Sequence, residues 1–150
     1  MGAIRGERLV EIDAPAERCF AIAADIERAP AWQAALEEVD VLARDGDGRA
    51  ESVDAAFDAR VRTIRTRLRF AYQPPARIDW RQERGDVKAL HGWWRFEDLG
   101  DGRTAATYGL EVDPGRMLGL LLRGPTEGKV RDFLLGGAAE GLKARAEGAA

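Results

Sequence analysis

The 150-residue sequence predicts a single α+β domain in which an antiparallel sheet packs against a long C-terminal helix. Three observations support this class. Apolar and polar residues alternate in short segments between residues 39 and 112, which is the period of half-buried strands. Short turn sequences, including two Gly-Asp-Gly motifs, separate these segments, so neighbouring strands should be antiparallel. After Asp113 the apolar period changes to that of a helix.

The N-terminal part predicts one strand followed by two short helices. Residues 8–12 alternate as a strand. Residues 13–25 form a helical pattern with Asp13 as its cap and Pro15 in its first turn. Pro30 interrupts the helical pattern, and residues 31–38 are expected to form the second short helix.

Six strands and a long helix are expected to follow. The strands are predicted at residues 39–44, 51–59, 61–73, 78–84, 88–98 and 104–112. A short apolar segment at 117–122 precedes a helix that begins near Pro125 or Thr126 and ends near Glu147. Its sheet-facing stripe is predicted to contain Val130, Phe133, Leu134, Gly137, Ala138, Gly141 and Leu142.

The two-residue period of a strand separates an inner face from an outer face. The predicted inner face carries Val53, Ala55, Phe57, Ile64, Thr66, Leu68, Phe70, Tyr72, Ile78, Trp80, Gln82, Gly92, Trp94, Phe96, Ala106, Tyr108, Leu110 and Val112. His91, Trp93 and Arg95 then point outward, and His91 is given no catalytic role. Trp93 is left open, either as cover for the outer face or as a contact in a homodimer.

Composition argues against several classes of function. The net charge is only −3, and the outward arginines at 65, 67 and 69 have acidic residues on the next strand to pair with, so no nucleic-acid partner is expected. One Cys and one His cannot build a zinc cage. Ser52 and His91 lie within predicted strands without the glycines of a nucleophile elbow, and Cys19 fits a core position.

The sequence therefore predicts no metal and no cofactor. Gly124–Val130, GPTEGKV, departs from a phosphate-binding loop because its second glycine comes one residue early and Val130 replaces the Ser or Thr. The longest apolar run, at 117–122, is too short to span a bilayer, and the first residues lack a signal-peptide core. A cytoplasmic location is expected.

Three segments resemble one protein family: VEIDAPAERCFAIAADIERAPAW from Val10, GWWRF from Gly92 and TAATYGLEV from Thr104. These segments and their order along the chain resemble those of proteins in the START-related superfamily (SRPBCC), in particular polyketide cyclase/dehydrase and Coq10-type proteins. The resemblance implies a helix-grip fold, with a curved sheet of six to seven strands wrapped around the C-terminal helix. It also implies a cavity between sheet and helix for a hydrophobic or aromatic molecule.

The resemblance and the strand alternation together define the candidate ligand-binding residues. These are Trp32, Phe57, Thr66, Leu68, Phe70, Trp80, Gln82, Trp94, Tyr108, Phe133 and Gly137. The pocket is expected to have a volume of roughly 300 to 1,000 Å³, the usual range for small-molecule sites.

Carriage or sensing of an apolar small molecule is the favoured function. The predicted inner face offers no carboxylate, and its polar groups are Thr66, Tyr72, Gln82 and Tyr108, with Arg8 or Arg62 at a rim. A cyclase or dehydratase, with Tyr108 or Tyr72 as general acid, is the enzyme alternative. An interaction protein like the family's ribosome-association toxin is the third.

Overall fold

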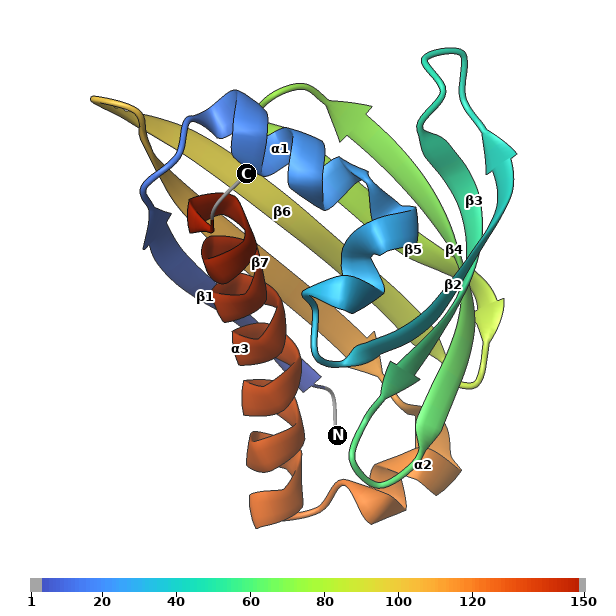
Figure 1. The fold of residues 1–150 in the computed structure, drawn as a ribbon. Helices are drawn as coiled ribbons and strands as arrows, with labels where there is room; N and C mark the ends of the chain where they lie inside the picture. The colour runs from blue at the N-terminus through green and yellow to red at the C-terminus, as the bar shows by residue number, and fades with distance from the viewer. Residues whose placement is uncertain (1–3, 149–150) are drawn as a thin grey trace.

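The computed structural model describes residues 4–148, which form one curved antiparallel sheet that wraps around a long helix (Figure 1). The elements in chain order are β1 (Ile4–Ile12), α1 (Ala16–Ala24), the 3-10 helix η1 (Ile26–Ala31), β2 (Leu36–Arg44), β3 (Ala50–Asp58), β4 (Thr63–Gln73), β5 (Arg77–Gly85), β6 (Ala89–Gly100), β7 (Arg103–Asp113), α2 (Gly115–Leu121) and α3 (Pro125–Glu147). The predicted α+β helix-grip fold is confirmed.

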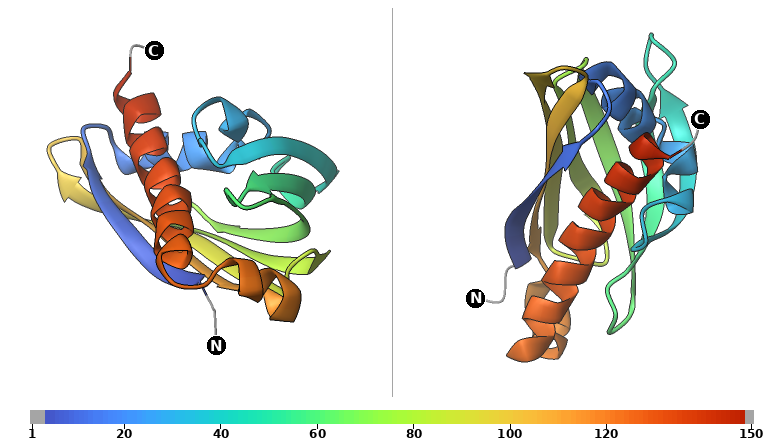
Figure 2. Two further views of the ribbon diagram at one scale, coloured as in Figure 1. Left: turned by 90° about the horizontal axis from the view of Figure 1, so that it is seen from below. Right: turned by 60° about the vertical axis from the view of Figure 1, so that its left-hand side comes forward.

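The seven strands are ordered β1-β7-β6-β5-β4-β3-β2, so the first strand of the chain pairs with the last one. Ile4 pairs with Val112 and Ile12 with Thr104. The remaining strands form a meander because each connects to its neighbour by a short turn. Helix α3 packs mainly on β1 and β7. Helix α1 lies beside it over β6 and β7, and η1 continues across the concave face to β2 (Figure 2).

The region between α1 and β2 differs from the prediction. The second short helix ends at Ala31, and β2 already begins at Leu36, where a helix through residue 38 was expected. Leu36 pairs with Phe57, and the Asp58 amide donates to the Ala35 carbonyl. Pairing with β3 therefore outweighs the local helical pattern.

The start of α1 also differs from the prediction. Asp13 does not cap the helix, because Pro15 occupies the N-cap position in extended backbone and α1 begins at Ala16. The Asp13 amide instead donates to the Glu147 Oε2 atom at 2.8 Å, and so connects the end of β1 to the end of α3.

The inner faces of the strands are the ones that the alternation predicts. The buried face of α3, however, is rotated about the helix axis relative to the predicted stripe. Ile64, Thr66, Leu68 and Phe70 are buried as expected. On α3, however, the buried residues are Val130, Leu134, Leu135, Ala138, Ala139, Leu142 and Ala146. Phe133, Gly137 and Gly141 are only half-buried. The rotation follows from the close approach to β1, where a Cβ added to Gly6 would lie 2.9 Å from the Leu135 Cδ1 atom.

The outward face carries ion pairs, as the sequence indicated, but not all are with the next strand. Arg69 contacts Glu83 on β5 at 3.0 Å, as expected, whereas Arg67 makes two hydrogen bonds, at 2.7 and 3.0 Å, to Asp54 on the preceding strand β3. The indole N–H of Trp93 donates to Glu7 at 2.8 Å. Trp93 thus covers the outer face of its own chain, and the homodimer stays a prediction.

None of the helices within residues 4–148 combines the length and apolar character needed to cross a lipid bilayer.

Candidate functional site: two apolar cavities on the inner face of the sheet

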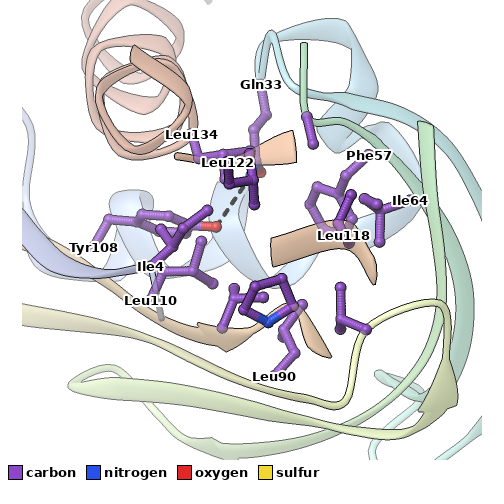
Figure 3. Close-up of a pocket in the computed structure, with 14 residues that line it drawn as sticks. Ile4, Gln33, Phe57, Ile64, Leu90, Tyr108, Leu110, Leu118, Leu122 and Leu134 are labelled. Atoms are coloured by element: carbon purple, nitrogen blue, oxygen red, sulfur yellow. Dashed lines mark hydrogen bonds between the residues drawn. The ribbon is translucent and has the colours of Figure 1, made fainter. Parts of the chain in front are cut away.

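One cavity lies between the inner face of the sheet, α2 and α3, with a volume of about 40 Å³ (Figure 3). The sheet supplies most of its wall, α2 contributes Leu118, and α3 contributes Leu134. The lining residues are Ile4, Gln33, Phe57, Ala59, Ile64, Val87, Leu90, Tyr108, Leu110, Val112, Pro114, Leu118, Leu122 and Leu134. We call it the α2 cavity.

A second cavity of about 30 Å³ lies toward α1 and η1, and we call it the α1 cavity. It is lined by Ala23, Ile26, Ala29, Gln33, Leu36, Val39, Val53, Ala55, Phe57, Leu68, Phe70, Trp80, Trp94 and Tyr108. The two cavities share Gln33, Phe57 and Tyr108, so these three side chains separate them.

Both volumes are far below the 300 to 1,000 Å³ expected from the sequence. Aromatic side chains fill most of the space. The Trp80 ring centre lies 5.6 Å from that of Phe70 and 5.7 Å from that of Tyr108, and Trp94 meets the Tyr108 ring edge-on at 4.8 Å. The expectation of one large open pocket is therefore wrong for this conformation.

Gln33 and Tyr108 form the polar contact between the two cavities. Gln33 is positioned just after η1 by its backbone N–H, which donates to the Ala29 carbonyl at 2.8 Å, and Tyr108 lies in the middle of β7. The Gln33 Nε2 group donates to the Tyr108 hydroxyl at 3.5 Å (Figure 3). Gln33 is 7% exposed and Tyr108 is 2% exposed, so an apolar environment surrounds this pair.

Burial raises the pKa of Tyr108 above its usual value, and the hydrogen bond from Gln33 only partly offsets that effect. The phenol is therefore neutral at pH 7 and keeps a hydroxyl proton that it can donate to a hydrogen-bond acceptor. Among the described residues that line either cavity, none carries an ionisable carboxylate, imidazole, amine or guanidinium group. The site can bind apolar groups and hydrogen-bond to an oxygen, but it offers no charged group.

Six of the candidate residues line a cavity: Phe57, Leu68, Phe70, Trp80, Trp94 and Tyr108. Thr66 and Gln82 do not. The Thr66 hydroxyl donates to the Gln82 Oε1 atom at 2.8 Å, and the Gln82 Nε2 group donates to the Val87 carbonyl at 2.9 Å. These two side chains are thus engaged in holding the turn between β5 and β6.

Trp32, Phe133 and Gly137 also lie outside both linings. Trp32 contacts α3 through its carbonyl, which a Cβ on Gly141 would overlap. The Phe133 ring faces the loop between β3 and β4, where the Arg60 guanidinium lies 3.8 Å from the ring centre. Gly137 faces Ala34, whose Cβ would be 3.5 Å from an added Cβ.

Tyr72 faces the sheet interior but its hydroxyl donates to the Ala50 carbonyl, and burial raises its pKa. The Tyr72 hydroxyl therefore already has a hydrogen-bond partner within the protein, and Tyr72 lines neither cavity. Of the inward polar groups expected from the sequence, only Tyr108 reaches the cavities.

Gln33 is the polar cavity-lining residue that the sequence reasoning missed. Residues 31–38 were assigned to a helix of undefined orientation, so no face could be given to Gln33. A signal was present, because Gln33 is the single polar side chain in the stretch PAWQAAL. Leu118 and Leu122 were also missed, since the segment that carries them had no predicted partner.

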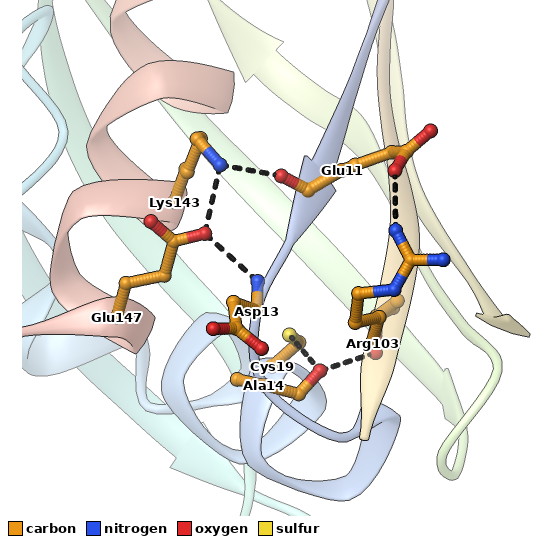
Figure 4. A network of polar contacts seen from close by, with 8 residues as sticks. Glu11, Asp13, Ala14, Cys19, Arg103, Lys143 and Glu147 are labelled. Atoms are coloured by element: carbon orange, nitrogen blue, oxygen red, sulfur yellow. Dashed lines mark hydrogen bonds and ion pairs between the residues drawn. The ribbon is translucent and has the colours of Figure 1, made fainter. Parts of the chain in front are cut away.

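A polar network holds the far end of α3 against β1 (Figure 4). The Lys143 ammonium donates to the Glu11 carbonyl at 2.6 Å and to Glu147 at 2.7 Å, and it lowers the pKa of Glu147. Thr104 and Cys19 both donate to the Ala14 carbonyl beside it. Burial raises the pKa of the Cys19 thiol, so this cysteine is a core residue, as expected.

The model of the family described as polyketide cyclase / dehydrase and lipid transport matches residues 12–135. A curated relative, the granaticin polyketide synthase bifunctional cyclase/dehydratase of Streptomyces violaceoruber, is 35% identical over 103 residues. This match covers 67% of the chain but only 31% of the relative.

Solved structures show the same fold at low sequence identity. A START superfamily protein from Mycobacterium smegmatis has a TM-score of 0.82 at 23% identity, with 95% of this chain and 97% of that one covered. A protein from Thermus thermophilus has a TM-score of 0.80 at 24% identity, with 96% of each chain covered. The Zhui aromatase/cyclase from a Streptomyces species has a TM-score of 0.75 at 20% identity, covering 97% and 94%.

Proposed function

Because this chain belongs to the polyketide cyclase/dehydrase and lipid transport family, we propose that it binds a hydrophobic or aromatic small molecule in the α1 and α2 cavities. The observation that carries the proposal is the lining of both cavities, which is apolar except for the Gln33–Tyr108 pair. Transfer of apolar surface from water into such a lining is worth about 25 cal/mol per Å². The favoured role is carriage or sensing.

Binding requires the two cavities to widen, because neither holds a multi-ring molecule in this conformation. Phe57 is the half-buried member of the three residues that separate them, whereas Gln33 and Tyr108 are buried. Displacement of the Phe57 ring would join the cavities. The α2 helix and the loop after Ala59 border the α2 cavity, and we place the ligand entrance between them.

A cyclase or dehydratase acting on a polyketide is the second candidate. The matched relative favours it, since that protein is a bifunctional cyclase/dehydratase. Here the neutral Tyr108 hydroxyl would hydrogen-bond to a substrate carbonyl and stabilise the enolate that precedes ring closure. The raised pKa of Tyr108 makes it a poor proton donor, and no described residue that lines either cavity is a carboxylate, imidazole or amine that could act as a base. A water molecule would therefore have to take the α-proton and return it to the alkoxide that ring closure forms.

Native mass spectrometry of freshly purified protein tests the binding proposal. We expect a mass increase from a co-purified apolar molecule. The uncharged dye Nile red should also bind, and Ala59→Leu, which fills part of the α2 cavity, should weaken its binding by about tenfold or more. Ala71→Leu, at an exposed position on β4, is the matched control.

The binding proposal fails if no small molecule co-purifies and the probe binds equally well to wild type and Ala59→Leu. The enzyme candidate predicts a product that has lost water or closed a ring when the protein is incubated with a poly-β-ketone analogue. Tyr108→Phe should lower that rate. The cytoplasmic location remains a prediction from the sequence.

A further inference from the structure

We propose that Gln33 and Tyr108 together recognise one hydroxyl or carbonyl oxygen near the middle of an otherwise apolar ligand that spans both cavities. This inference rests on the proposed binding function and names the chemical class of the ligand. The expected class is a neutral, multi-ring ketone or phenol with apolar groups on both sides of its oxygen.

The position of the pair determines where the ligand oxygen lies. Gln33 and Tyr108 line both cavities, so a molecule that extends from one cavity to the other must pass them. Figure 3 shows that the Gln33 and Tyr108 side chains point toward each other, with Leu122 and Leu134 nearby. The polar atoms are thus central and the apolar side chains lie to either side.

The hydrogen bonding of the pair is incomplete within residues 4–148. The Gln33 Nε2 group donates to the Tyr108 hydroxyl at 3.5 Å, which is the long limit for such a bond. In this part of the chain no hydrogen bond uses the Gln33 Oε1 atom, and none takes the Tyr108 hydroxyl proton. The Oε1 atom also keeps some accessible surface, because no sealed side-chain polar atom among these residues lacks a hydrogen-bond partner, and its residue lines both cavities.

The Tyr108 hydroxyl proton and the Gln33 Oε1 atom each retain unused hydrogen-bonding capacity, and a correctly placed ligand oxygen can use it. A carbonyl oxygen can accept the Tyr108 hydroxyl proton, and a ligand hydroxyl can donate to the Gln33 Oε1 atom. A carboxylate or an amine would bring an unpaired charge into an apolar site without a counter-ion, which is strongly unfavourable. The pair therefore selects neutral oxygen groups.

Fluorenone and fluorene are a matched pair of probes for this site, because they differ only in a central ketone flanked by two rings. We expect wild-type protein to bind fluorenone about tenfold more tightly than fluorene. Tyr108→Phe and Gln33→Leu should each reduce this preference to about twofold or less by weakening fluorenone binding alone. The infrared carbonyl stretch of bound fluorenone should also rise in Tyr108→Phe, because the hydrogen bond is lost.

Tyr72→Phe is the control, since the Tyr72 hydroxyl donates to the Ala50 carbonyl and lines neither cavity. It should keep the full preference and the wild-type carbonyl frequency. Equal affinity of wild type for the two probes, or a preference that survives in both Gln33→Leu and Tyr108→Phe, overturns the inference and leaves the binding function standing. Failure of both probes to bind, or to compete with Nile red, overturns both the inference and the binding function.

Discussion

The indole of Trp80 lies directly over Gly92, its partner on the neighbouring strand, where a Cβ atom would overlap the ring. Trp93 lies over its own partner, Gly109, in the same way on the outer face of the sheet. In each case the absence of a side chain on one strand lets a tryptophan of the next strand lie flat on the sheet. Trp80, the tryptophan of the inner pair, lines the α1 cavity.

Gly92→Ala should destabilise the protein by about 1 to 3 kcal/mol, because the added methyl group displaces the Trp80 ring from the sheet. Urea unfolding followed by tryptophan fluorescence measures the change. Gly46→Ala is the control, since an added Cβ there meets no atom within 4 Å. Equal stability of the two variants would show that Trp80 relaxes without cost.

Gly109→Ala should also lower the free energy of unfolding, by about 1 to 3 kcal/mol, through overlap with Trp93. The displaced indole would lose its hydrogen bond to Glu7. A double-mutant cycle with Trp93→Ala isolates this cause. The cost of Gly109→Ala should fall in the Trp93→Ala background, and an unchanged cost would assign the effect to the backbone of β7 instead.

Two half-buried glycines of α3, Gly137 and Gly141, should respond in opposite directions to alanine. Gly137→Ala should stabilise the protein by up to about 1 kcal/mol, because alanine favours helix and the added Cβ lies at an ordinary 3.5 Å from Ala34. Gly141→Ala should destabilise it, because the Cβ would overlap the Trp32 carbonyl. Thermal unfolding of the two variants side by side is the measurement, and the same sign for both would contradict the packing described here.

Glu147→Gln should reduce stability in a pH-dependent way. Lys143 and the Asp13 amide lower the folded-state pKa of Glu147 below its unfolded value. The carboxylate therefore stabilises the fold above about pH 4.3, and this contribution is lost as the pH falls through the lower, folded-state pKa.

Since Glu147 is partly exposed, the difference from wild type should stay below about 1 kcal/mol at pH 7. It should shrink toward zero in strong acid. Glu140→Gln, at an exposed position on the same helix, is the control and should match wild type at both pH values. A difference that grows on acidification would show that Glu147 is not stabilised in its charged form.

Alternation and turn residues were sufficient to predict the fold class, the strand order along the chain and the inner faces of the strands. Phe70, Trp80 and Trp94 were correctly placed because the two-residue period is a local property of an extended chain. The errors lie where a distant partner competes with local preference. Leu36 belongs to a strand rather than a helix because Phe57 is there to pair with it.

The sequence by itself thus determined which elements form and which strand faces are apolar. Only the tertiary structure decided how α3 is rotated, how little free space remains, and that Gln33 meets Tyr108, 75 positions further along the chain. A helix with small residues on several sides can present more than one face, and the choice depends on how closely β1 approaches it at Gly6. Cavities and buried polar contacts depend on packing between elements far apart in sequence. The local spacing of apolar residues along the chain does not specify this packing.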